Sequence, residues 1–207
     1  ATSDGPIMVK INDTTIDILQ TVNFTEKKDI PAYQASFSTE KCSETVFYAS
    51  SMSGIARIEL KSDYEIETSF YTEDSNPSIP IVNVRVLKYD SATNVLWAGS
   101  EGYGLNQIFL DENYYPVSIH TYQHIEGDVS SLSSDYVRTL YLDSNRDLWI
   151  GTYEGLNKAI GAINNSSYTL RRFKSDDGLP NNMIQSIQED SDGNLWLGTN
   201  GGLSKYK

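Results

Sequence analysis

Short apolar runs alternate with turns rich in Gly, Asp, Asn and Ser along the whole chain. In one stretch, four such runs follow one another, at 136–143, 148–152, 156–160 and 168–174. Short runs of β-branched and aromatic residues favour strands, and the tight turns between them favour antiparallel pairing of neighbours. The pattern therefore predicts a four-stranded antiparallel sheet.

The same unit recurs along the chain, each time with one aromatic residue in its second run. These aromatic residues, at intervals of 50, 52 and 47 residues, are Phe47, Trp97, Trp149 and Trp196. In the last three units a glycine follows two positions later, at Gly99, Gly151 and Gly198, whereas the earliest unit has Ala49 there. This spacing predicts a stack of similar sheets.

Four strands in every unit of about 40–50 residues predict an all-β fold, a β-propeller fragment of about four four-stranded antiparallel blades. One such sheet cannot bury both of its faces alone, whereas blades packed face to face can. The tryptophan would fill the space between blades, and the glycine would leave room where backbones approach closely. We expect one partial propeller domain over 1–207, with seventeen strands in blade pieces at 5–24, 33–74, 81–124, 135–174 and 183–207.

Segments 137–156 and 184–203 share the string Leu-Trp-x-Gly-Thr followed by Gly-Leu, and a weaker copy lies at 84–105. This string resembles the regulator-propeller repeat of two-component signalling proteins, as found in Bacteroides-type hybrid sensor histidine kinases. The resemblance implies a periplasmic sensor region upstream of a transmembrane helix and a histidine kinase core, in a ring of about seven blades. It also implies an extracytoplasmic, non-catalytic ligand-sensing domain, because many relatives respond to oligosaccharides.

The predicted units leave an incomplete blade at each end of the chain. An arc of this kind would expose apolar blade faces at both ends, which predicts self-association of the fragment. The alternative is a compact four-blade closure in which the N-terminal strand completes the last blade. The remaining expected partners are an oligosaccharide ligand, together with the rest of the propeller and the kinase in the parent protein.

The chain is acidic, with 28 Asp and Glu against 16 Lys and Arg and a formal net charge of −12. A surface of this charge repels phosphate, which argues against nucleic acid and anionic membranes as partners. No apolar run approaches the about 18–20 residues that span a bilayer, so direct membrane insertion is not expected. The one cysteine, Cys42, excludes an intramolecular disulfide.

Because consecutive strands run in opposite directions, the turns between second and third strands share one edge of the propeller with the loops between blades. The resemblance implies that ligands bind at this edge, near the central channel. The candidate ligand-binding residues there are Tyr103, Tyr136, Tyr153, Glu154, Asn181 and Asn200. Aromatic rings stack on sugar rings, and amides and carboxylates bind hydroxyl groups. The competing interpretation is that turns simply require Asn, Asp and Gly, which favours Tyr103 and Tyr153 as candidates because turns do not require Tyr.

Other motifs favour structural roles. The segment 190–194 resembles part of a calcium loop, but a strand follows at once, which favours a hairpin turn. His120 and His124 would lie about 13 Å apart along an outer strand, too far to share a metal ion. We expect no metal, no cofactor and no catalytic residues. Two rival functions remain open, a propeller enzyme (lyase or glycosidase) and a protein-docking scaffold.

Overall fold

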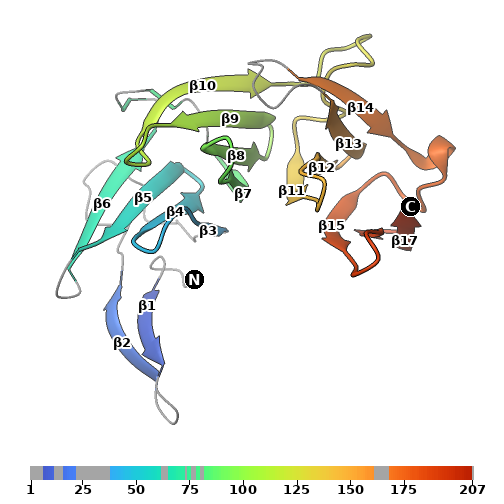
Figure 1. Ribbon diagram of the computed structural model, residues 1–207. Coiled ribbons are helices and arrows are strands. Elements are labelled where there is room, and N and C mark those ends of the chain that lie inside the picture. Colours follow the sequence, from blue (N-terminus) through green and yellow to red (C-terminus); the bar gives the residue numbers. More distant parts are fainter. Residues whose placement is uncertain are drawn as a thin grey trace.

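The computed structural model consists of five antiparallel sheets that follow one another along an open arc (Figure 1). It describes residues 7–11, 16–21, 38–61, 65–72, 74–75, 78–79, 82–160 and 168–206. The predicted blade pieces 5–24 and 33–74 extend in part beyond these residues. Seventeen strands occur in the described part of the chain, as the sequence predicts.

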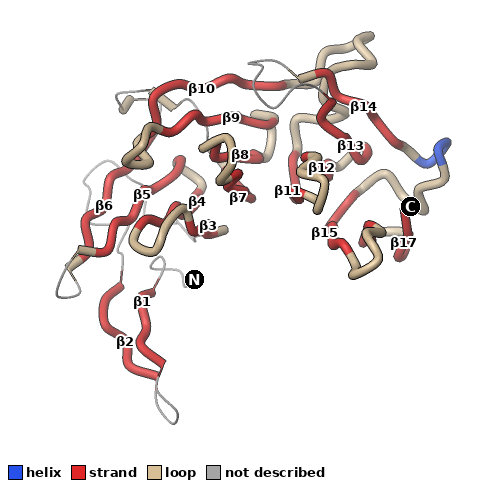
Figure 2. The backbone as a smooth tube through the Cα atoms, in the orientation of Figure 1, coloured by secondary structure: helices blue, strands red, loops and turns tan. Residues whose placement is uncertain are grey.

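Each sheet consists of strands that are consecutive in the sequence and hydrogen-bonded in that order. The two-stranded hairpin is β1 (Ile7–Ile11) and β2 (Ile16–Thr21); the first blade is β3 (Thr39–Lys41), β4 (Val46–Ser51), β5 (Gly54–Leu60) and β6 (Ile66–Tyr71); the second is β7 (Val84–Asp90), β8 (Val95–Ser100), β9 (Leu105–Leu110) and β10 (Pro116–Tyr122); the third is β11 (Val137–Leu142), β12 (Leu148–Thr152), β13 (Gly155–Ile160) and β14 (Thr169–Phe173); the fourth is β15 (Ile184–Glu189), β16 (Leu195–Thr199) and β17 (Gly202–Tyr206). One turn of 3-10 helix, η3 (Ser175–Asp177), connects the third and fourth blades and is the blue segment of Figure 2. It is the one helix among the described residues, none of which forms a helix suited in length and apolar character to crossing a membrane.

The first strand of each blade lies on the concave side of the arc, where β7, β11 and β15 contact one another in succession (Figure 1). The fourth strands, β10 and β14, lie on the convex side. This is the radial arrangement of propeller blades, with the first strands beside the central channel.

The core lies between blades rather than within one sheet. Trp97 is 3% exposed and packs among apolar residues of the third blade, Val137, Leu140, Leu148 and Ile150. Trp149 is 2% exposed and packs among apolar residues of the fourth, Ile184, Ile187, Leu195 and Leu197. Burial of these large rings holds each blade against the next.

Gly99 and Gly151 lie at the closest approach between neighbouring blades. A Cβ atom on Gly99 would lie 2.4 Å from Cγ1 of Val137, and one on Gly151 would lie 2.8 Å from Cγ2 of Ile184. Both distances are too short for non-bonded carbon atoms. A side chain at either position would therefore force the blades apart.

The first blade corrects one prediction. Phe47 was expected at the position of the tryptophans, but the pairing register places Tyr48 there: Tyr48 lies opposite Arg57, as Trp97 lies opposite Gln107. Tyr48 is fully buried toward the second blade, whereas Phe47 packs on the opposite face of its sheet. The sequence alignment was wrong by one residue because Ala49 resembles the glycine, while the register assigns that position to Ser50.

The far end of the arc is open. Leu203 of the fourth blade is 66% exposed, whereas its equivalents Leu105 and Leu156 are 1% and 0% exposed. Trp196 is correspondingly only half-buried. The sheet β15–β17 has three strands and β1 pairs with β2, so the N-terminal strand does not complete the last blade and the four-blade closure is wrong.

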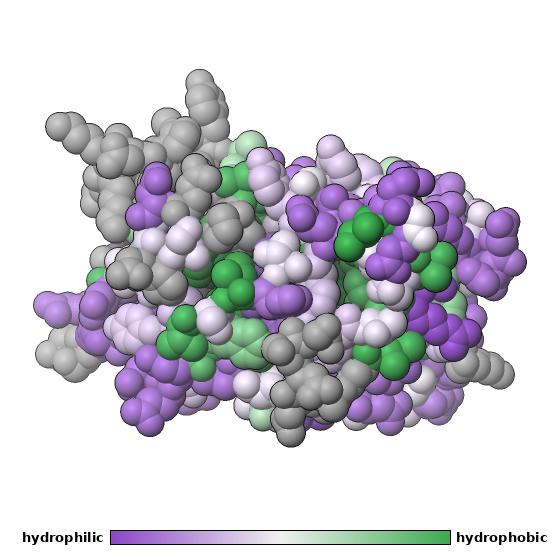
Figure 3. Space-filling model, turned by 90° about the horizontal axis from the view of Figure 1, so that it is seen from above, coloured by the Kyte–Doolittle hydropathy of each residue, from purple (hydrophilic) through white to green (hydrophobic). Residues whose placement is uncertain are grey.

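The first blade buries the apolar face that is turned away from the second blade. On the face of the first blade that is turned away from the second, Ala49 and Ala56 are fully buried and Ile58 is 6% exposed. On the face seen from above, apolar residues form separate patches among hydrophilic ones (Figure 3). Among the side chains that the structure describes, the exposed apolar blade face is therefore that of the fourth blade.

Candidate functional site

Three β-bulges lie at equivalent positions beside the central channel. The pairing of the first strand shifts by one residue between Val84 and Val86, between Val137 and Thr139, and between Ile184 and Ser186. The extra residues at these bulges are Arg85, Arg138 and Gln185. A bulge releases one residue from regular pairing and redirects its side chain, which explains how a polar residue in each inner strand faces the channel edge.

The turn after the second strand lies beside each bulge. Its first residue donates a backbone hydrogen bond to the carbonyl just before the first strand: Glu101 to Asn83 (2.9 Å), Tyr153 to Tyr136 (3.1 Å) and Asn200 to Met183 (3.3 Å). The sequence differs at this position from blade to blade, but the backbone bond is the same. Each blade thus presents one bulge residue and one turn residue side by side.

Six side chains, joined by hydrogen bonds and ion pairs, form a row across three blades. We call it the channel row: Arg85, Glu101, Arg138, Tyr153, Gln185 and Asn200. Within blades, Arg85 Nε lies 2.9 Å from Glu101 Oε1, and Gln185 Nε2 donates to Asn200 Oδ1 at 2.7 Å. Between blades, Arg138 donates to Glu101 Oε1 (3.3 Å) and to Gln185 Oε1 (3.0 Å). Arg138 thus connects the second blade to the fourth.

A pair of stacked tyrosines lies against this row. The rings of Tyr136 and Tyr153 are 5.3 Å apart at an interplanar angle of 23°. The Tyr153 hydroxyl donates to Glu101 Oε1 at 3.3 Å, while Tyr136 remains 48% exposed. The pair therefore offers an aromatic surface to solvent beside several hydrogen-bonding groups.

Glu101 is ionised in this setting. Its partial burial favours the neutral acid, but the hydrogen bonds and charge of Arg85, together with hydrogen bonds from Tyr153 and Arg138, outweigh that effect. The pKa of the Glu101 carboxyl therefore lies below its ordinary value. The carboxylate holds two guanidinium groups and a phenol at one oxygen atom.

The structure brings four of the six predicted residues together at this edge. Tyr153 and Asn200 belong to the channel row, Tyr136 stacks on it, and Glu154 is an exposed neighbour of Tyr153 on the same turn. Asn181 lies in the next blade-to-blade loop and packs closely against Gly201. A Cβ atom added to Gly201 would lie 3.0 Å from the Cβ of Asn181. Tyr103 is 44% exposed on the turn of the second blade, where the register makes Glu101 rather than Tyr103 the equivalent of Tyr153.

Sequence reasoning missed the bulge residues Arg85, Arg138 and Gln185, and also Glu101. Each bulge residue follows the first apolar residue of its inner strand, so the sequence shows a polar residue at a constant place in the repeat. Regular alternation assigned that residue to an ordinary strand position. The bulge itself is a feature of strand pairing that one strand cannot reveal.

The segment 190–194 is a hairpin turn. The Asp190 carboxylate accepts hydrogen bonds from the backbone of Asp192 and Asn194, and from the side chains of Asn194 and Trp196. Its oxygens are therefore engaged within the turn. No group of three or more potential metal ligands occurs in the described ranges.

The histidines and the cysteine lie away from the channel row. His120 is an exposed residue of β10, whereas His124 lies beyond the end of that strand, where its Nδ1 is 2.8 Å from the carbonyl of Leu132. The expectation that both histidines share one strand is thus wrong. Burial raises the pKa of the Cys42 thiol to about 12, which disfavours the reactive thiolate.

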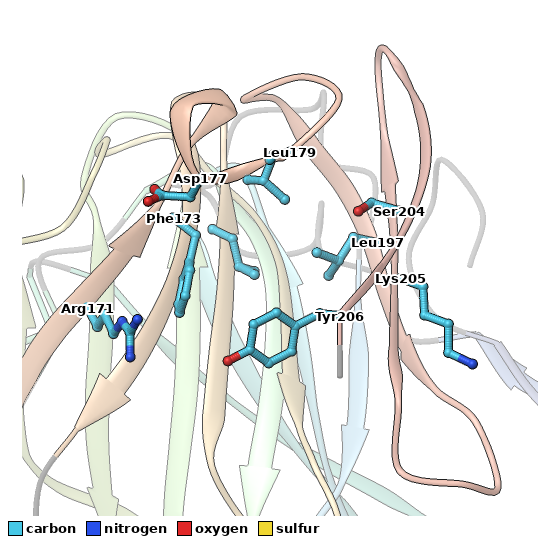
Figure 4. Close-up of a pocket in the computed structure, with 10 residues that line it drawn as sticks. Arg171, Phe173, Asp177, Leu179, Leu197, Ser204, Lys205 and Tyr206 are labelled. Atoms are coloured by element: carbon cyan, nitrogen blue, oxygen red, sulfur yellow. The ribbon is translucent and has the colours of Figure 1, made fainter.

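A concavity of about 300 Å³, separate from the channel row, lies between the third and fourth blades (Figure 4). Its apolar lining includes Phe173, Leu179, Leu197 and Tyr206. Between the second and third blades, the equivalent space is filled by the third blade's fourth strand, β14: Leu170 of β14 and Tyr168, the residue just before it, belong to the packed core there. The concavity is therefore the place that a fourth strand of the last blade would fill, a feature of the open end of the arc.

Comparison with known proteins connects this geometry to a family. Residues 131–154 and 178–201 match the family model of the two component regulator propeller. These two segments are similar to the two-component regulator propeller repeat. They include the turn residues Tyr153 and Asn200, so the matched segments contribute to the channel row.

Proteins similar to this chain include a histidine kinase and the extracellular domains of two signalling systems. The chain is 29% identical over 122 residues to "Histidine kinase P4" of Formosa agariphila, an alignment that covers 58% of this chain and 7% of the kinase. It is similar to the extracellular domain of a predicted hybrid two-component system from B. thetaiotaomicron, with 24% identity and a TM-score of 0.60 over 84% of this chain and 21% of that domain. The extracellular domain of a predicted one-component system from the same organism has 17% identity and a TM-score of 0.66 over 84% of this chain and 24% of that domain. The chain thus spans less than a quarter of the length of each of these proteins.

Solved structures of similar fold also include enzymes. A virginiamycin B lyase from Staphylococcus aureus has 14% identity and a TM-score of 0.57, over 99% of this chain and 63% of the lyase. At this identity the similarity shows the propeller fold alone.

Proposed function

We propose that this chain is part of the extracytoplasmic, periplasmic sensor of a two-component signalling protein, and that it binds an oligosaccharide at the channel row and relays binding to a histidine kinase. The observation that carries this proposal is the stacked pair of Tyr136 and Tyr153, exposed beside hydrogen-bonding groups from three blades. Exposed stacked rings stabilise nothing in the core, whereas they match the apolar face of a sugar.

The channel row also offers a physical route for a signal. A ligand that binds Tyr153 and Asn200 would contact two blades at once, and Arg138 connects both to Glu101 of a third. Binding of this kind stabilises one relative placement of the blades over others. A change in blade placement is what a kinase downstream of the propeller would detect.

We propose that the chain itself is non-catalytic. Hydrolysis or elimination of a sugar requires a positioned general acid or base. The carboxylate in the channel row, Glu101, is engaged by Arg85, Arg138 and Tyr153, which stabilise its ionised form. Such a carboxylate is a poor proton donor at neutral pH.

Binding can be tested by titrating oligosaccharides of several compositions into the 207-residue chain in a calorimeter. Tyr153→Ala and Tyr136→Ala should each weaken binding by about tenfold, because each removes half of the aromatic surface. His120→Ala removes an exposed ring from the outer strand β10 and should leave affinity unchanged. Product analysis after prolonged incubation should show intact oligosaccharide.

Two results would contradict the proposal. Absence of binding for every oligosaccharide would exclude sugar sensing by this chain, and recovery of a protein partner in its place would favour a docking scaffold. Turnover of any oligosaccharide would favour the enzyme.

A further inference from the structure

Arg138 is held less tightly than other arginines that connect blades. Its Nη1 lies 3.3 Å from Glu101 Oε1 and 3.4 Å from the Tyr153 hydroxyl. By contrast, Arg146 Nη2 lies 2.6 and 2.8 Å from the two oxygens of Asp90. Charge-assisted N–H···O bonds are usually about 2.7–2.9 Å long, so the two contacts of Arg138 Nη1 are long ones, while its Nη2 donates to the neutral amide oxygen of Gln185 at 3.0 Å. A ligand group can replace them at small cost.

The channel row carries more positive than negative charge among its hydrogen-bonded groups. One carboxylate, Glu101, lies between two guanidinium groups, those of Arg85 and Arg138. Arginine stays protonated at all ordinary pH values, so this excess is permanent. Glu154 on the adjacent turn is exposed, and water screens its charge more than that of the partly buried row. In a chain with a net charge of −12, such a site is a local exception.

Arg138 is also placed beside the aromatic surface. Its Cζ lies 5.5 Å from the centre of the Tyr153 ring, and that ring stacks on Tyr136. The Arg138 side chain remains 29% exposed. Substituents of a sugar stacked on the tyrosines can therefore reach the Arg138 guanidinium, which is partly exposed and makes long hydrogen bonds through Nη1.

We propose that the ligand of the channel row is an anionic oligosaccharide whose carboxylate or sulfate group binds Arg138. The planar guanidinium matches the paired oxygens of either group, and Gln185 and Asn200 beside it can bind hydroxyls. This inference rests on the proposed function and specifies its substrate class.

The test compares oligosaccharides of one backbone and length in three forms: neutral, uronate-containing and sulfated. Each is titrated into the wild-type chain and into Arg138→Gln, Arg138→Lys and Arg171→Gln, the last an exposed arginine on the outer strand β14. The wild type should bind an anionic form about tenfold more tightly than the neutral one. Arg138→Gln should abolish that preference, so that the neutral and anionic forms bind with equal affinity, whereas Arg138→Lys should keep part of it and Arg171→Gln should keep all of it.

The preferred anionic form identifies the group, carboxylate or sulfate. Equal affinity of the wild type for neutral and anionic forms would overturn this inference, as would a preference that survives Arg138→Gln. In each case the proposed function stands if Tyr153→Ala still weakens sugar binding. If no oligosaccharide of any form binds, both fail together.

Discussion

At the scale of single residues, an aspartate from the first turn of the blade anchors the tryptophan. The indole Nε1 of Trp149 donates to Asp143 and that of Trp196 to Asp190, both at 2.8 Å. The ring can therefore be buried without leaving its one donor unpaired. In the second blade the equivalent Asp90 instead binds Arg146 of the third blade. One repeat position thus serves either the inside of a blade or the joint between two.

The Asp190 anchor makes stability depend on pH. Backbone and side-chain hydrogen bonds from Asn194, with that of Trp196, hold the pKa of Asp190 well below its ordinary value of about 3.9. A carboxyl whose pKa is lower in the folded state stabilises fully above its unfolded pKa, and this contribution is lost as pH falls below about 4. Thermal unfolding of wild type between pH 7 and pH 3 should show a falling midpoint, and Asp190→Asn should reduce that fall.

The control for this prediction is Asp192→Asn, a change of the same kind in the same exposed turn. It should leave the pH dependence as in the wild type. An equal effect of both substitutions would assign the dependence to general charge rather than to the tryptophan anchor.

The glycine at each joint gives a second residue-scale prediction. Gly151→Ala places a Cβ 2.5 Å from Thr139 and 2.8 Å from Ile184, so it should destabilise the chain by about 1–3 kcal/mol. Gly198→Ala meets only Ser186 of its own blade, a small side chain that can rotate away, and should cost less. Urea unfolding of both variants measures the difference, and equal losses would contradict the role of Gly151 as a blade contact.

At the scale of elements, the register of strand pairing decides which residue of a strand faces the neighbouring blade or the channel, and the sequence of one strand does not reveal that register. The seventeen strands and their order follow from short apolar runs and turn residues, because consecutive pairing is a local property. The register of the first blade does not follow, since Val46–Ser51 offers Phe47 and Tyr48 at adjacent positions and either could face the next blade. For the candidate site, the turn tyrosines were predictable from composition, whereas Arg138 depends on a bulge and was not.

The register of the first blade can be tested directly. Tyr48 is fully buried and donates a hydrogen bond to the carbonyl of Tyr114 at 2.7 Å, so Tyr48→Ala should cost about 3–5 kcal/mol. Phe47→Ala removes a partly buried ring on the opposite face and should cost less. Tyr48→Phe, which loses only the hydroxyl, should cost about 1 kcal/mol. If Phe47→Ala lowers the free energy of unfolding more than Tyr48→Ala in urea, then Phe47 and not Tyr48 occupies the position of the tryptophans.

At the scale of the whole molecule, the fourth blade leaves one apolar face uncovered. Leu203 is exposed and Trp196 is half-buried where their equivalents are buried, and the atoms nearest to a Cβ on Gly198 all belong to Ser186 of its own sheet. At the other joints a β-branched residue of the next blade, Val137 or Ile184, occupies that place. We propose that the partner of this face is a further blade of the same repeat type, in the parent protein or in a second copy.

For the isolated chain this proposal predicts self-association at high concentration. Sedimentation should give a mass above the 23.2 kDa of one chain, and Leu203→Glu should return it to that value because it places a charge in the apolar contact. Val117→Glu changes an exposed apolar residue of β10, at 56%, and should leave association unaffected. A clean monomer of the wild type at high concentration would exclude association through this face.

A glycine on one blade meets a β-branched side chain on the next at two successive joints. Adding or removing one blade therefore creates no contact of a new kind, although the closed ring limits a propeller to about four to eight blades. Proteins built from such units can duplicate, lose or exchange whole blades, and so vary the residues at the channel edge, without a new scaffold.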